Sequence, residues 1–204
     1  MRTASLSVLV VLSLAAIDGR AAAAQGDAMM TRHDSLDIVR LSATRKAAER
    51  GDAAAQCRLG FAYLNGTGVP QDYAEAAKWF RKAADQGHAL AQFPLGIMLF
   101  SGTGVPKNAT EAATWYRKAA EQGHASAQYY LGMLYDGGGG GVPDDIVQAY
   151  LWVTLAAQHP VGDDLSEPLR VRAMGLRKVL QARMTSAQVA EAERLSAAWV
   201  PRKP

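Results

Sequence analysis

Residues 47–82 read AAERGDAAAQCRLGFAYLNGTGVPQDYAEAAKWFRK, and residues 83–118 read AADQGHALAQFPLGIMLFSGTGVPKNATEAATWYRK, with no gap between them. A third copy begins at Ala119 and runs to residue 157, lengthened by one residue in the glycine run Gly137–Gly141. A period of 36 residues is typical of repeat proteins, whose units bury their apolar faces against their neighbours. We therefore predict one array of three repeats, at residues 47–82, 83–118 and 119–157.

The first half of each copy predicts a helix that ends at glycine. In the first copy Ala55, Leu59 and Tyr63 recur at i, i+4 and i+8, which places them on one helical face. Gly66 supplies the backbone freedom that ends a helix, and the residue before Pro70 is biased toward an extended conformation.

The second half of each copy predicts another helix, with a capping residue at its start. Asp72 is a good N-cap, and Glu75 stands three residues later, where its side chain would reach back to the cap. The equivalent pairs are Asn108 with Glu111 and Asp145 with Gln148.

The flanking residues complete the array. Residues 34–50 end like a second helix and predict an N-terminal half-repeat, while residues 163–200 predict two C-terminal capping helices. The predicted helices are therefore 35–50, 53–64, 73–86, 89–100, 109–122, 125–136, 146–158, 167–183 and 186–199.

Glycine recurs inside each predicted first helix, although it costs about 1 kcal/mol there relative to alanine. The positions are Gly60, Gly96 and Gly132. We expect the paired helices to touch at these glycines. We also expect an indole to cover each contact: Trp79, Trp115 and Trp152.

The pattern A-x-x-G-x-A-x-A-Q-x-x-L-G-x-x-Y, then G-x-G-V-P, then A-x-x-W-[YF]-x-K-A-A closely resembles the Sel1-like repeat. The resemblance spans residues 47–157. It implies an all-α fold: a right-handed α/α solenoid of three 36-residue helical-hairpin repeats with N- and C-terminal capping helices, related to tetratricopeptide arrays, with the first helices on the concave side. Two residues depart from the pattern. Pro94 is expected to kink its helix, and Leu99 replaces a tyrosine.

Residues 1–24 have the layout of a secretory signal peptide. A basic residue, Arg2, precedes twelve apolar residues at 6–17, and small residues lead to Ala24, where we expect cleavage. An uncleaved interfacial anchor is the alternative. The expected location is periplasmic or secreted, with no stable membrane insertion once the signal is removed.

No motif for catalysis, a cofactor or a metal is found, so the sequence predicts a protein that is not an enzyme. Cys57 is the only cysteine. His88 and His124 occupy equivalent positions, interpreted as solvated helix starts, and the run Gly137–Gly141 is interpreted as a lengthened turn. A net charge of +3 does not suggest nucleic acid.

Basic residues concentrate in one predicted capping helix. They are Arg170, Arg172, Arg177, Lys178 and Arg183. We interpret them as the solvated side of an amphipathic helix, with contact to an anionic envelope surface such as lipid or polysaccharide as the alternative.

The remaining candidate site is a surface on the first helices, where residues differ between copies. Packing between equivalent repeats should favour similar residues, so variation suggests exposure. The predicted partner-binding residues are Arg58, Phe93, Met98, Tyr129 and Tyr130. Burial between repeats is the alternative. The functional hypothesis is an exported scaffold for an unidentified protein or peptide partner in the cell envelope, and the alternative is a cell-wall glycan-binding or glycan-hydrolysing protein.

Overall fold

The structure, a computed structural model, describes residues 41–137, 139–160, 162 and 165–202. This part of the chain is helical and contains no strand, only an isolated bridge between Gly162 and Leu165. Residues 41–49 form a helix. The helices that follow are α3 Ala53–Asn65, α4 Tyr73–Asp85, α5 Ala89–Ser101, α6 Ala109–Glu121, α7 Ala125–Gly137, α8 Ile146–Gln158, α9 Glu167–Arg183 and α10 Ser186–Ala198.

These helices confirm the predicted ones, because each boundary of α3 to α10 lies within one residue of its expected position. The helix predicted at 35–50 is described only from residue 41. The predicted signal peptide, with its cleavage position, lies outside the described residues.

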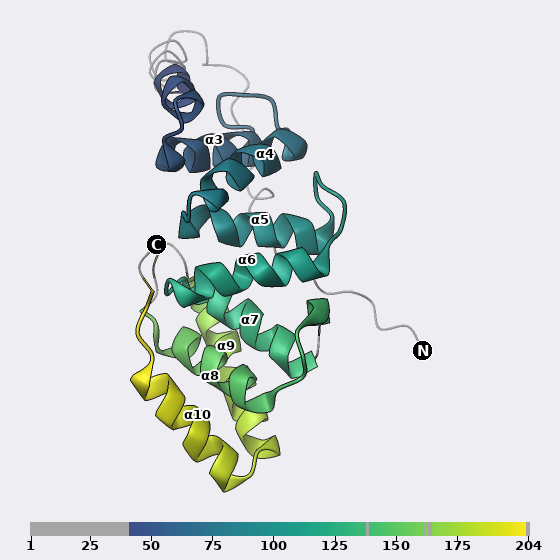
Figure 1. The fold of residues 1–204 in the computed structure, drawn as a ribbon, viewed down its shortest axis with the longest axis vertical. Coiled ribbons are helices and arrows are strands. Elements are labelled where there is room, and N and C mark those ends of the chain that lie inside the picture. The colour runs from purple at the N-terminus through teal and green to yellow at the C-terminus, as the bar shows by residue number, and fades with distance from the viewer. Residues whose placement is uncertain (1–40, 138, 161, 163–164, 203–204) are drawn as a thin grey trace, which may run out of the picture.

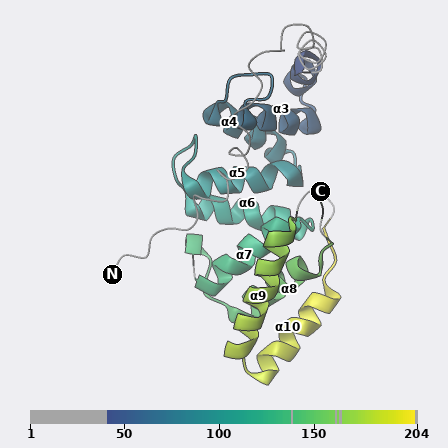
Figure 2. The same ribbon diagram turned by 180° about the vertical axis from the view of Figure 1, so that it is seen from behind.

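The helices stack as consecutive pairs into an α/α solenoid (Figure 1). The pairs are α3 with α4, α5 with α6, and α7 with α8, and each pair packs against the next. Helices α9 and α10 both pack against α8 and close this end of the array, as the view from behind also shows (Figure 2). None of the described helices combines the length and the apolar character that crossing a lipid bilayer requires.

Within each pair the two helices meet at the predicted glycines, which we call the helix-pair seam. A Cβ atom placed on each glycine would lie too close to the facing side chain. The distance would be 2.7 Å from Gly60 to Phe80, 2.7 Å from Gly96 to Tyr116 and 2.5 Å from Gly132 to Val153. Only glycine admits so close an approach without movement of the partner. The seam is confirmed, but the prediction that tryptophan covers it is wrong.

The tryptophans miss the seam because each stands one residue earlier, about 100° around its helix. The first two indoles instead lie beneath the ammonium group of a lysine on the next turn. Lys82 Nζ lies 4.0 Å from the centre of the Trp79 ring, and Lys118 Nζ lies 4.2 Å from the centre of the Trp115 ring. Trp152 contacts Trp199 edge to face, with ring centroids 6.3 Å apart. The third indole therefore anchors the C-terminal segment to the array.

The capping residues are confirmed at the starts of the second helices. The side chains of Asp72, Asn108 and Asp145 each accept the backbone N–H three residues later, at 3.0 Å. The returning bond that completes a capping box is present at the start of α10, where the Thr185 N–H donates to Gln188 at 2.9 Å.

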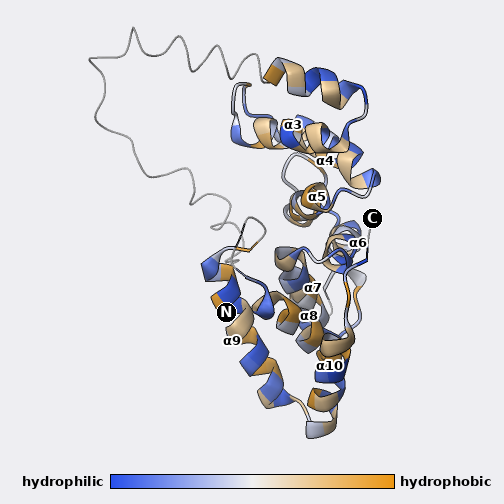
Figure 3. Cartoon of the chain, turned by 90° about the vertical axis from the view of Figure 1, so that its left-hand side faces the viewer, coloured by the Kyte–Doolittle hydropathy of each residue, from blue (hydrophilic) through white to orange (hydrophobic). Residues whose placement is uncertain are grey.

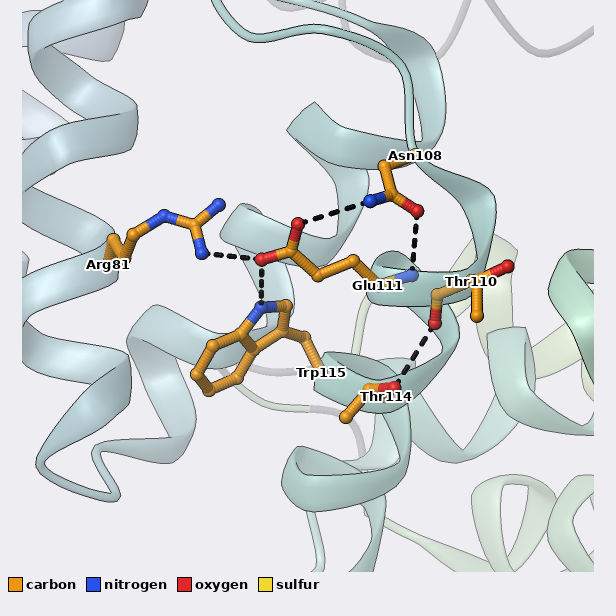
Figure 4. Close-up of polar contacts among 6 residues, drawn as sticks. All are labelled: Arg81, Asn108, Thr110, Glu111, Thr114 and Trp115. Carbon is orange, nitrogen blue, oxygen red and sulfur yellow. Dashed lines mark hydrogen bonds and ion pairs between the residues drawn. The ribbon is translucent and has the colours of Figure 1, made fainter.

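Glu111 accepts a hydrogen bond from the side-chain amide of its own cap, Asn108, at 3.4 Å, and it also joins two repeats (Figure 4). It pairs with Arg81 of the preceding repeat and accepts from the Trp115 indole at 3.3 Å. The hydrogen bond from Arg81 is the main reason that the pKa of Glu111 is lowered. Because both side chains are partly exposed, the pair adds little to stability.

This pairing follows from the substitution at Leu99. At the other two junctions, the equivalent arginine donates to a tyrosine hydroxyl: Arg45 to Tyr63 at 3.1 Å, and Arg117 to Tyr135 at 3.3 Å. Leu99 offers no hydroxyl at this position, so Arg81 turns to the carboxylate instead.

Neither Pro94 nor the glycine run interrupts the order of the helices. Helix α5 runs on through Pro94 to Ser101, although proline removes one backbone donor. In the glycine run, Gly139–Gly141 form a short 3-10 turn. Gly140 has a φ of 63° there, and a Cβ on it would lie 2.6 Å from the Ala109 carbonyl oxygen.

Candidate partner-binding surface

The first helices α3, α5 and α7 bury one face in every repeat. Leu59, Leu95 and Leu131 all have 0% exposure, and each precedes a seam glycine. In each pair the same leucine and glycine pack against an equivalent second helix. Packing therefore determines which residue types this face can carry.

A different face of the same helices is accessible in every repeat. Two equivalent positions, three residues apart, lie on it and share one side of the helix. Their occupants are Arg58, Pro94 and Tyr130 at the first, and Phe61, Ile97 and Met133 at the second. We call these six residues the first-helix surface. Phe61 and Met133 are its most exposed apolar side chains, at 39% and 45%.

Of the five predicted residues, the structure places two on the first-helix surface, one beside it and two in the core. Arg58 is exposed and Tyr130 half-buried, and both belong to the first-helix surface. Phe93 is half-buried beside it, packed against the core. Met98 and Tyr129, however, are only 3% and 8% exposed. They are core residues, and this burial removes both from the candidate surface.

The same comparison of repeats contained a signal for two residues that the prediction omitted. Phe61 and Met133 lie three residues after Arg58 and Tyr130, respectively, and their common position varies between copies. Two variable positions at i and i+3 on one helix indicate an exposed face more strongly than one variable position does.

A cluster of rings supports the surface at the second and third repeats. The Phe93 ring centre lies 5.6 Å from that of Tyr130 and 4.8 Å from that of His124. Tyr116 stacks beneath Tyr130 at 5.6 Å. His124 is 7% exposed, and its Nδ1 accepts the Ala127 N–H at 3.3 Å. The interpretation of His124 as a solvated residue is therefore wrong.

The first-helix surface is almost uncharged. Among Arg, Lys, Asp and Glu, the 39 residues of α3, α5 and α7 include only Arg58 and Asp136. Asp136 is held by Arg183 at 2.6 Å. Burial raises the pKa of Tyr130, and the nearby Arg172 lowers it only partly. The phenol is therefore neutral at physiological pH.

The described residues contain no group of three or more His, Cys, Asp or Glu side chains arranged to hold a metal ion. Cys57 is 4% exposed. Burial raises the pKa of its thiol to about 11, so it is neutral at physiological pH and a poor nucleophile.

Comparison with known proteins gives consistent matches. The Sel1 repeat family matches residues 53–88, 89–124 and 125–160. These units keep the 36-residue period but begin six residues later than the predicted repeats, the first of which begins at residue 47. No curated protein matches the sequence.

Solved structures that are similar to this chain include two crystal structures of known origin. The first, a protective antigen present in uropathogenic Escherichia coli strains that displays an SLR fold, is 38% identical, with a TM-score of 0.66 over 78% of this chain and 32% of that one. This chain therefore spans about a third of the length of the antigen. The second, a Sel1 repeat protein from Oxalobacter formigenes, is 38% identical, with a TM-score of 0.57 over 67% of this chain and 98% of that one.

Proposed function

Because this chain belongs to the Sel1 repeat family, we propose that it is a non-catalytic scaffold of the cell envelope that holds a protein or peptide partner on its first-helix surface. Sel1 repeats generally mediate protein–protein interaction, which gives the class of function. The observation that carries the finer proposal is the exposure of Phe61 and Met133 on a face whose one charged residue is Arg58.

The energetics favour this use of the surface. Apolar area left in water is unfavourable by roughly 25 cal/mol per Å², and a partner that covers it recovers that free energy. The ring cluster holds Tyr130 in place, so little conformational entropy is lost when a partner binds. Aromatic anchors of this kind often dominate interface energies.

Export is proposed from the layout of residues 1–24. N-terminal sequencing of the protein from its native host tests it. A first residue close to Gln25 supports export, and an intact Met1 on cytoplasmic protein contradicts it.

The alternative of a glycan-hydrolysing protein lacks a supporting observation. Such an enzyme generally needs two carboxyl groups across the bond to be cleaved. The only Asp or Glu on the first helices is Asp136, and Arg183 holds it in an ion pair.

The test is quantitative binding of a partner captured from an envelope extract. We compare Phe61→Ser combined with Met133→Ser against Val200→Ser, which alters an apolar residue with 74% exposure elsewhere. The double variant should bind at least tenfold more weakly, while the control binds normally. Because the Phe61 ring packs edge to face on Phe80 at 4.9 Å, binding is measured at a temperature at which circular dichroism shows all three proteins to be folded. Equal affinity of the three proteins would place the partner elsewhere and reject the proposed surface.

A further inference from the structure

Helix α9 concentrates the positive charge of the chain. Its 17 residues include Glu167 and five basic residues, which gives a formal charge of +4 against +3 for the whole protein. The other 187 residues therefore sum to −1. Two aspartates precede the helix, Asp163 and Asp164, and lie outside the described residues.

The same helix exposes apolar side chains on the face that it turns away from the solenoid. Ala173 and Leu180 are fully buried against α8, whereas Val171, Met174 and Val179 are 56%, 39% and 54% exposed. Apolar and polar residues alternate along the helix, which flanks the array (Figure 3). The exposed face thus combines valine and methionine with cations.

Of the five cations, two are paired within the protein, Arg177 is half-buried, and two are exposed. Arg170 pairs with Glu167 at 3.0 Å, and Arg183 pairs with Asp136 at 2.6 Å. Arg172 and Lys178 are exposed, and neither forms an ion pair within the described part of the chain. Lys178 lies on the stripe of Val171 and Met174, at spacings of seven and four residues.

We propose that this face of α9, formed by Val171, Arg172, Met174, Lys178 and Val179, docks on the surface of an anionic phospholipid bilayer. Positive charge matches the lipid phosphates, and the valine and methionine side chains reach the boundary between head groups and acyl chains. Long cationic side chains lie with their apolar stems along apolar surface while their charged ends remain in water. A face that mixes cationic and apolar side chains therefore suits the boundary between a bilayer and water.

A lipid surface fits this face better than a protein partner does. Protein interfaces are built around a dense, complementary centre that is usually anchored by aromatic residues. Here the exposed apolar side chains are two valines and a methionine, none of them aromatic, and cations lie among them, so they offer no such centre. A fluid bilayer adapts its shape to the helix and needs none.

Co-sedimentation with vesicles tests the proposal. The full chain is mixed with vesicles of phosphatidylcholine, either pure or containing about 30% phosphatidylglycerol as the anionic lipid. The readout is the ratio of the two affinities, because the apolar segment at residues 6–17 is common to all variants. We expect preference for the anionic vesicles, declining as salt screens the charges.

The critical variant is Arg172→Glu with Lys178→Glu, which should lose at least tenfold in affinity for the anionic vesicles. The matched control is Lys46→Glu with Arg50→Glu, which changes the net charge equally at exposed residues outside both proposed surfaces. Equal losses in both variants, or no preference for anionic vesicles in the unaltered chain, would overturn the proposal.

A second pair of changes tests the apolar contribution. Val171→Ser with Val179→Ser should weaken vesicle binding several-fold without altering the charge. No change would overturn the docking face as defined. The Phe61→Ser, Met133→Ser variant should bind vesicles normally, so failure of the scaffold proposal remains separate from failure of this one.

Discussion

The two faces of the first helices differ in how much their residues vary between the three repeats. On the helix-pair seam, leucine followed by glycine recurs in all three repeats, as at Leu95 and Gly96. On the first-helix surface, Arg58, Pro94 and Tyr130 share one position but no chemistry. The repeats of one chain thus act as an internal alignment, in which identity marks the contacts that every helix pair must make.

Variation, in contrast, does not by itself mark a surface. Tyr129 differs from its counterpart Cys57, yet both are buried. Their neighbours differ, because Tyr129 packs in a cluster with Leu180 of the capping helix α9, whereas Cys57 packs within the array. A repeat at the end of a solenoid meets a different neighbour, so buried positions vary there too.

The largest predicted effect is at the seam. Leu95→Ala should lower the free energy of unfolding by roughly 2–5 kcal/mol, because it leaves a cavity between helices α5 and α6. Urea denaturation followed by circular dichroism measures it. Unchanged stability would mean that the repeated leucines are not what holds the helix pairs together.

A glycine of the seam should be next in sensitivity. A Cβ on Gly132 would lie 2.5 Å from Val153 and 3.1 Å from the Ala149 carbonyl oxygen, which cannot easily move. Gly132→Ala should therefore cost about 1–3 kcal/mol, despite the better helix propensity of alanine.

Gly175 provides the matched control for that substitution. It also lies within a helix, but apart from its chain neighbours and the backbone of its own helix, no atom of the described residues lies within 4 Å of an added Cβ. Gly175→Ala should stabilise the fold by about 0.5–1 kcal/mol, since only helix propensity changes. A loss of similar size at both glycines would show that close packing is not the reason for glycine at the seam.

A smaller effect is expected at Tyr116, the residue that covers Gly96. Its hydroxyl is buried and has no hydrogen-bond partner among the described residues, and burial strongly raises its pKa. The equivalent residue of the first repeat is Phe80. Tyr116→Phe should raise the free energy of unfolding by about 1 kcal/mol, because an unsatisfied buried group is removed. A decrease in stability would show that the hydroxyl is satisfied in solution.

The helices could be predicted from sequence because their signals are local. Asp72 as a cap and Gly66 as a terminator each act within one turn of chain, and the repeat supplies each signal more than once. The rotation of each helix against its neighbours is not local. For this reason the sequence predicts Trp79 at the seam, where the structure has Phe80, and predicts Met98 on the surface, although it is buried.

The smallest predicted effect comes from comparing two methionines, one buried in the core and one on the first-helix surface. Met98 and Met133 both lie on first helices at positions that vary between repeats, but they are 3% and 45% exposed. Met133→Ala should change the free energy of unfolding by less than about 0.5 kcal/mol, as surface substitutions usually do. Met98→Ala should cost about 2–5 kcal/mol through the cavity that it leaves. Equal losses would mean that Met133 is also a packing residue, and the first-helix surface would lose the side chain that exposes most apolar area in the third repeat. If Met133→Ala alone keeps full stability, the fold does not depend on that methionine, and the binding of its double variant with Phe61→Ser can be interpreted without a change in folding.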